Sequence, residues 1–103
     1  MPALARNNSK TLPKKKEKLQ EPRDYRVVLL NDNYTTQEFV VEVLESVFHL
    51  RYEDAAHIMK NVHHKGRGVV GTYTWDIAQT RVNQVHALAE KNNFPLRCVV
   101  EEV

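Results

Sequence analysis

Three adjacent polar residues, Asn31-Asp32-Asn33, form the clearest cluster of side chains able to hold a ligand. Asp32 is a compact anion that could accept hydrogen bonds from an ammonium group, and the flanking amides could add further acceptors. The same residue types are also turn formers and helix caps, and the bare pattern favours that structural role. A binding role for Asp32 therefore depends on what surrounds the turn.

Catalysis has little support in the sequence. Serine occurs only at Ser9 and Ser46, and neither lies in a nucleophile-elbow motif. The three glycines follow a predicted helix instead of opening one, so they do not form a phosphate-binding loop. The single cysteine, Cys98, lies in an apolar run, where cysteine usually behaves as a small core residue. We expect a binding protein that is not an enzyme and needs no cofactor.

A metal site is not expected either. His63 and His64 are adjacent on a predicted helix and point about 100° apart, so they cannot chelate one ion together. His57 and His86 fall at predicted surface positions. The Asn-Asp-Asn turn lacks the alternating acids and the downstream glutamate of an EF-hand loop.

Two predicted helices bring apolar side chains toward the Asp32 turn. The first carries Val40, and the second carries Met59 and Val62, with His63 next in sequence. If the helices pack together, these residues meet beside the turn, and an acidic mouth lies over an apolar pocket. Such a site suits a ligand with a cation close to a large hydrophobic group. Met59 and Val62 are also compatible with plain core positions.

Hydrophobic periodicity and turn residues predict six elements. They are strand 25–30, helix 36–48, helix 52–64, strand 68–73, a third helix between Thr74 and Asn92, and strand 96–100. This β-α-α-β-α-β order predicts an α/β fold of the α+β sandwich type, in which a three-stranded antiparallel sheet packs against three helices on one face.

The first helix is predicted to begin at a capping box. Thr35 and Glu38 have the spacing in which the hydroxyl and the carboxylate each bond the other residue's amide. Tyr34 and Phe39 stand at the positions of a hydrophobic staple. The sequence therefore predicts Thr35 as the N-cap.

Charge divides the chain into two parts. The 103 residues have a formal net charge of +2, but residues 1–23 hold seven Lys or Arg against two Glu, whereas residues 24–103 hold eight against eleven acids. Residues 1–23 also contain three of the four prolines and no aromatic residue, which predicts a disordered basic extension. Residues 24–103 are then an acidic folded domain without the basic, aromatic-rich face of a nucleic-acid-binding protein.

Length and hydropathy favour one small soluble domain. The apolar runs are far shorter than the roughly 20 residues of a membrane-spanning helix, and no signal peptide is recognisable. One cysteine agrees with a reducing compartment. We expect a cytoplasmic monomer that binds no membrane and no nucleic acid.

Several segments closely resemble the bacterial ClpS adaptor family. They are YRVVLLNDNYTTQEFV (25–40), AAHIMKNVH (55–63), AQTRV (78–82) and PLRC (95–98), in the same order and spacing. Members of this family are adaptors of the N-end rule, which capture proteins that begin with Leu, Phe, Tyr or Trp and deliver them to the ClpA unfoldase of the ClpAP protease. The resemblance implies two partners, a ClpA-type AAA+ unfoldase and N-degron peptides.

The resemblance also implies roles for single residues. Asn31, Asp32 and His63 would hold the α-amino group of the substrate. Asp76 and Arg81 on the third helix would contact the unfoldase, and the basic extension matches in place the segment that family members use for handover. The substrate side chain would be enclosed by Asn33, Thr35, Gln37, Val40, Met59, Val62 and Leu96.

Two positions depart from the family pattern. Asn33 stands where a second aspartate is common, so we expect weaker electrostatic attraction of the substrate cation. Gln37 stands where a methionine often gates the pocket. Because Gln37 is unbranched and similar in length, we expect the preference for aromatic and leucine termini to persist.

Overall fold

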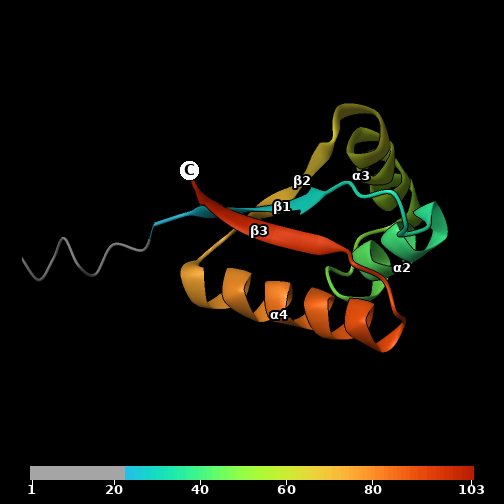
Figure 1. The fold of residues 1–103 in the computed structure, drawn as a ribbon. Coiled ribbons are helices and arrows are strands. Elements are labelled where there is room, and N and C mark those ends of the chain that lie inside the picture. Colours follow the sequence, from blue (N-terminus) through green and yellow to red (C-terminus); the bar gives the residue numbers. More distant parts are fainter. Residues whose placement is uncertain (1–22) are drawn as a thin grey trace, which may run out of the picture.

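The computed structural model describes residues 23–103, which form a three-stranded sheet and three helices (Figure 1). The prediction of a disordered extension falls, except for Arg23, outside these residues. The elements in chain order are β1 (Tyr25–Leu30), α2 (Gln37–Ser46), α3 (Tyr52–Lys65), β2 (Arg67–Tyr73), α4 (Trp75–Lys91) and β3 (Arg97–Glu102). The predicted order and class are confirmed, with boundaries shifted by at most two residues.

Strand β1 lies in the centre of the sheet, in the order β2-β1-β3, and both neighbours run antiparallel to it. Its apolar run explains this position, because Val27, Val28 and Leu29 are all fully buried. A bulge interrupts the pairing with β2 between Val27 and Val28. The central strand ends at Leu30, directly before the Asn31 turn.

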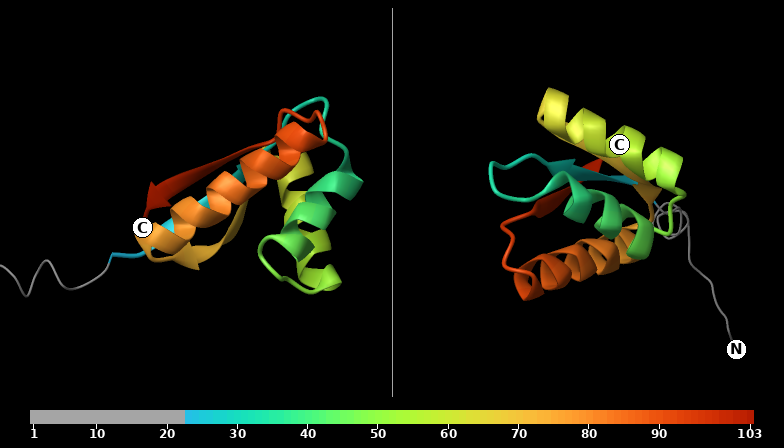
Figure 2. Two further views of the ribbon diagram at one scale, coloured as in Figure 1. Left: turned by 90° about the horizontal axis from the view of Figure 1, so that it is seen from below. Right: turned by 90° about the vertical axis from the view of Figure 1, so that its right-hand side faces the viewer.

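The helices bury their apolar stripes against one another and against the sheet. Helix α4 contacts all three strands and runs along the sheet, whereas α2 and α3 lie together at one end (Figures 1 and 2). Helix α3 packs on β2 and α2 packs on α3. The turn after β1 therefore projects beside the α2–α3 pair.

The start of α2 differs from the predicted capping box. The N-cap is Thr36, whose hydroxyl accepts the Phe39 N–H at 3.1 Å. Thr35 was the wrong candidate because its own hydroxyl is turned back to donate to Asp32. The predicted staple is also wrong, since Tyr34 is 77% exposed.

Two glycines fix the position of α3. Gly66 ends the helix in the left-handed conformation, with φ of 87°, and its carbonyl accepts the Asn31 N–H at 3.0 Å. At Gly68, a Cβ atom would stand only 2.7 Å from a Val62 methyl carbon, so α3 and β2 can approach closely only with glycine there. These contacts hold the last two turns of α3 beside the end of β1.

A second strand–helix junction involves His86. This residue was predicted at the surface, but it is half-buried, and its Nε2 accepts the Cys98 backbone N–H at 3.0 Å. The prediction was wrong because β3 is an edge strand. The Cys98 N–H has no neighbouring strand on its outer side to bond, and His86 on α4 supplies the acceptor. Cys98 is buried as expected, and burial raises the pKa of its thiol to about 12, which keeps it protonated and unreactive near neutral pH.

None of the helices within residues 23–103 has the length and apolar character needed to cross a bilayer.

Candidate functional site

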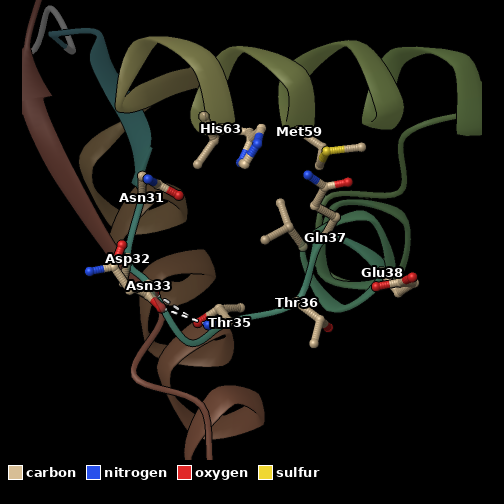
Figure 3. Close-up of a pocket in the computed structure, with 11 residues that line it drawn as sticks. Asn31, Asp32, Asn33, Thr35, Thr36, Gln37, Glu38, Met59 and His63 are labelled. Atoms are coloured by element: carbon tan, nitrogen blue, oxygen red, sulfur yellow. Dashed lines mark hydrogen bonds between the residues drawn. The ribbon is translucent and has the colours of Figure 1, made fainter.

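A cavity of about 440 Å³ opens where the end of β1, the first turn of α2 and the second half of α3 meet. Figure 3 shows His63 and Met59 projecting from α3 on one side, with Thr35, Thr36 and Gln37 opposite and the Asn31 turn at one end. The lining residues are Asn31, Asp32, Asn33, Thr35, Thr36, Gln37, Glu38, Val40, Met59, Val62 and His63.

The Asp32 carboxylate organises the turn at the mouth of this cavity. Its Oδ1 accepts the backbone N–H group of Tyr34 at 2.8 Å. The same oxygen accepts the Thr35 N–H at 2.7 Å, and its Oδ2 accepts the Thr35 hydroxyl at 2.7 Å (Figure 3). Turn chemistry, the structural role that the bare pattern favours, is therefore present. It locks the loop that leads into α2.

Asp32 nevertheless stays charged and able to accept more. Partial burial raises its pKa, but the three hydrogen bonds from Thr35 and Tyr34 outweigh burial, so the pKa lies below its ordinary value. A carboxylate offers about four acceptor positions, and three are occupied here. The turn holds an anion at the mouth with capacity for one further donor.

The other polar groups at the mouth come from different elements. Asn31 follows β1 and is exposed, and His63 is exposed near the end of α3. The bond between the Asn31 N–H and the Gly66 carbonyl joins these two segments. An amide, an imidazole and a carboxylate therefore line one mouth, although His63 is 32 residues from Asn31 in sequence.

The inner wall of the cavity is apolar. Val40 and Val62 are almost fully buried, and Met59 is half-buried beside them. Gln37, which is exposed, extends from the start of α2 toward Met59 on α3 in Figure 3. The cavity thus joins an anionic, hydrogen-bonding mouth to a pocket that could desolvate a large hydrophobic group.

The residues predicted to bind the substrate meet here with one exception. Leu96 does not line the cavity; it is 2% exposed in the core and faces a separate hollow near His86 and Phe94. Sequence reasoning placed it at the site only by resemblance, because no periodicity connects β3 to the α2–α3 pair. Conversely, Thr36 and Glu38 line the cavity and were not predicted to, although both flank Gln37 in the first turn of α2.

Asp76 and Arg81 lie elsewhere, on α4, from which no residue lines the cavity. Asp76 is exposed in the first turn and Arg81 is half-exposed one turn further. Ile77, 45% exposed, stands between them around the helix circumference.

Comparison with known families identifies the chain's relatives. The sequence model described as "ATP-dependent Clp protease adaptor protein ClpS" matches residues 20–99. The chain belongs to the ClpS family. ClpS proteins are adaptors of the Clp protease and not the protease itself.

Curated ClpS adaptors resemble this chain over most of their length. The protein of Syntrophus aciditrophicus is 53% identical over 84% of this chain and 81% of its own length, and that of Neisseria meningitidis is 56% identical over 82% of each. Among solved structures, Agrobacterium tumefaciens ClpS2 bound to L-phenylalaninamide matches with a TM-score of 0.78 and 36% identity, over 81% of this chain and all of that one. The ClpS fold and family are thus shown by both sequence and structure.

Proposed function

We propose that this ClpS-family adaptor captures proteins by a free N-terminal Leu, Phe, Tyr or Trp and delivers them to a ClpA-type AAA+ unfoldase for degradation by ClpAP. One observation carries the proposal: a single cavity joins an anionic mouth to an apolar pocket. The first residue of a protein is the peptide unit that carries a cation and a side chain on the same carbon.

The mouth suits an α-ammonium group. Asp32 has an acceptor position free, and Asn31 and His63 can add hydrogen bonds from two sides. An internal peptide residue has no ammonium group, so it would cover these polar groups without pairing them, at a cost of about 1 to 3 kcal/mol. The mouth therefore selects a chain terminus.

The apolar wall suits a large side chain. Val40, Met59 and Val62 supply most of the hydrophobic surface, and Asn33, Thr35 and Gln37 complete the enclosure. Burying a leucine or aromatic side chain there contributes about 1.5 to 3 kcal/mol relative to leaving it exposed. Discrimination against alanine should therefore be tenfold or more.

The ligand of the structural neighbour supports this assignment. L-phenylalaninamide, bound by Agrobacterium ClpS2, has a free α-amino group, a phenyl side chain and an amide in place of the carboxylate. These are the features of the first residue of a peptide.

For delivery, we place the unfoldase contact on the exposed first turns of α4. Asp76 and Arg81 offer charges of opposite sign on either side of Ile77, a small amphipathic patch away from the cavity. An adaptor can thereby hold substrate and unfoldase at once. The protein then acts by binding alone, as a cytoplasmic monomer, with the basic extension serving handover.

The test is binding of three labelled peptides by fluorescence anisotropy. One begins with a free Phe, the second is its N-acetylated twin and the third begins with Ala. We expect tight binding of the first and at least tenfold weaker binding of the other two. Equal affinity for the acetylated twin would refute capture of the terminus, and equal affinity for the Ala peptide would refute the side-chain pocket.

A further inference from the structure

The separate hollow near His86 and Phe94 has a volume of about 330 Å³. It lies between the C-terminal end of α4 and the segment that leads into β3, and is called the α4–β3 hollow below (Figure 1). None of its lining residues lines the cavity beside Asp32. Pockets of about 300 to 1,000 Å³ are typical of small-ligand sites, so this hollow can take a group about the size of one amino-acid residue.

The buried side of the α4–β3 hollow is apolar. Ala89 and Leu96 are each 2% exposed and belong to the core. Phe94 is half-buried, and its ring packs on the Phe39 ring of α2 with the centroids 4.7 Å apart. A hydrophobic side chain placed against these residues would leave water without any need to open the core.

Two hydrogen-bond donors line the same hollow. The Nε2 atom of His86 accepts the Cys98 N–H at 3.0 Å, so the neutral imidazole carries its proton on Nδ1, which remains a donor. Arg97 is exposed, and none of the ion pairs within residues 23–103 includes it. Burial and the nearby Arg97 charge lower the pKa of His86, in keeping with a guanidinium close to the ring. One carboxylate can therefore pair with both groups.

Glu90 adds an acceptor on the α4 side of the hollow, where it is exposed. An ionised carboxylate only accepts hydrogen bonds, so Glu90 favours a ligand with an N–H group and disfavours one with several negative charges. A single carboxylate, an apolar side chain and an N–H group attached to the same carbon match the donors, the apolar wall and the acceptor. These are the groups of the last residue of a peptide.

We propose that the α4–β3 hollow binds the C-terminal residue of a peptide or protein when that residue is hydrophobic, such as leucine. Its carboxylate pairs with Arg97 and with the Nδ1–H of His86. Its side chain packs on Ala89 and Leu96, and its backbone N–H donates to Glu90. The site is independent of the proposed capture of N-termini, because the two cavities share no lining residue.

The experiment follows the backbone amides of the full chain by two-dimensional NMR during titration with short peptides. All the peptides are N-acetylated, so that they do not engage the cavity beside Asp32. The first ends in Gly-Ala-Leu with a free carboxylate, its twin ends in a C-terminal amide, and another ends in Gly-Ala-Gly. Isocaproate, which has the leucine side chain and a carboxylate but no N–H, serves as the small-acid probe.

We expect the first peptide to shift the amides of Glu90, Arg97 and Cys98, the last because its N–H is bonded to His86. The amide twin and the Gly-terminated peptide should bind at least about tenfold more weakly, since one lacks the charge and the other the side chain. Isocaproate should bind about threefold more weakly than the first peptide, because it offers nothing to Glu90.

Substitutions test the anion contact. Arg97→Gln should weaken binding of the first peptide about tenfold, whereas Arg97→Lys, which keeps the charge, should retain most of the affinity. Lys60→Gln is the matched control, because it removes an exposed positive charge from α3 outside both cavities. This variant should bind as the wild type does.

Several results would overturn the proposal. They are the absence of a saturable shift at peptide concentrations of about 1 mM or above, equal affinity for the carboxylate peptide and its amide twin, and equal losses in Arg97→Gln and Lys60→Gln. Isocaproate that binds as tightly as the first peptide would overturn the assignment to a peptide terminus. Because no probe has a free α-amino group, each of these results leaves the proposed capture of N-termini untouched.

Discussion

Two junctions in this molecule each place a histidine from a helix beside a strand, and they use it in opposite ways. At the α4–β3 junction, His86 is half-buried and its Nε2 accepts the Cys98 N–H at 3.0 Å. At the α3–β1 junction, the Asn31 N–H is satisfied by the Gly66 carbonyl instead, and His63 is exposed at the mouth of a cavity. Where the backbone supplies its own partner, the side chain is left available for a ligand.

Asp32 combines a structural role in its turn with the proposed role in ligand binding. Three of its acceptor positions are used by the turn, and one remains for the proposed ligand. Substitutions at the two junctions should therefore separate binding from stability, with Asp32 as the position where the two are coupled.

The largest expected effect comes from Asp32→Asn. The amide oxygen can still accept bonds from the turn, but the charge is lost, so affinity for a Phe-initiated peptide should fall about ten- to a hundredfold. Stability should fall modestly, as judged by the urea midpoint. Asp76→Asn, which removes a charge far from the cavity, should bind as wild type does; a similar loss in both variants would remove the special role of Asp32.

In contrast to Asp32→Asn, His86→Ala should change stability more than peptide affinity. Loss of the acceptor for the Cys98 N–H should lower the free energy of unfolding by about 1 kcal/mol or more, while peptide affinity changes little. His57→Ala, at an exposed position, is the matched control for unfolding in urea. If His86→Ala is as stable as the control, the hydrogen bond contributes nothing to the fold.

The contribution of His86 should also depend on pH. Burial and the nearby Arg97 charge lower the pKa of His86 in the folded protein. As pH falls, His86 therefore becomes protonated in the unfolded chain before it does so in the folded protein. Its contribution to the free energy of unfolding is complete above about pH 6.5 and is lost as pH falls through the folded pKa. The stability gap between wild type and His86→Ala should narrow from pH 7.5 to pH 5. A stability difference that grows as pH falls would contradict a lowered pKa of His86.

His63→Ala should weaken capture of the Phe-initiated peptide about three- to tenfold and leave the urea midpoint unchanged, because the ring is exposed and provides one of several contacts at the mouth. His64→Ala, its exposed neighbour outside the cavity, is the control. Equal effects of the two substitutions would mean that the imidazole at the mouth is not a ligand contact.

The smallest effect is expected for Asn33→Asp, which adds a second acid at the mouth. Affinity for the peptide cation should rise about two- to fivefold at low salt and little at high salt, because exposed charges are screened. Titration of the peptide at two salt concentrations measures this difference. Equal affinity of the variant and the wild type at low salt would show that residue 33 does not face the ammonium group.

Much of the fold follows from local sequence signals. The apolar run of β1, the amphipathic helices and the glycine after His64-Lys65 each act within a few residues, so element order and most boundaries are predictable. The sequence could not predict whether Thr35 or Thr36 is the N-cap, because both have suitable neighbours. The N-cap depends on which of the two hydroxyls donates to the Asp32 carboxylate, and this is decided only when the turn folds.

By itself, the sequence determined the six elements, the acidic character of the folded part, the Asn31-Asp32-Asn33 turn and the resemblance to the ClpS family. Tertiary structure decided that His63 lines a cavity whereas His86 holds an edge strand, and that Leu96 lies in the core. The reason is physical. Periodicity reports which face of an element is apolar, but the partner of each polar atom is set by contacts between elements far apart in the chain.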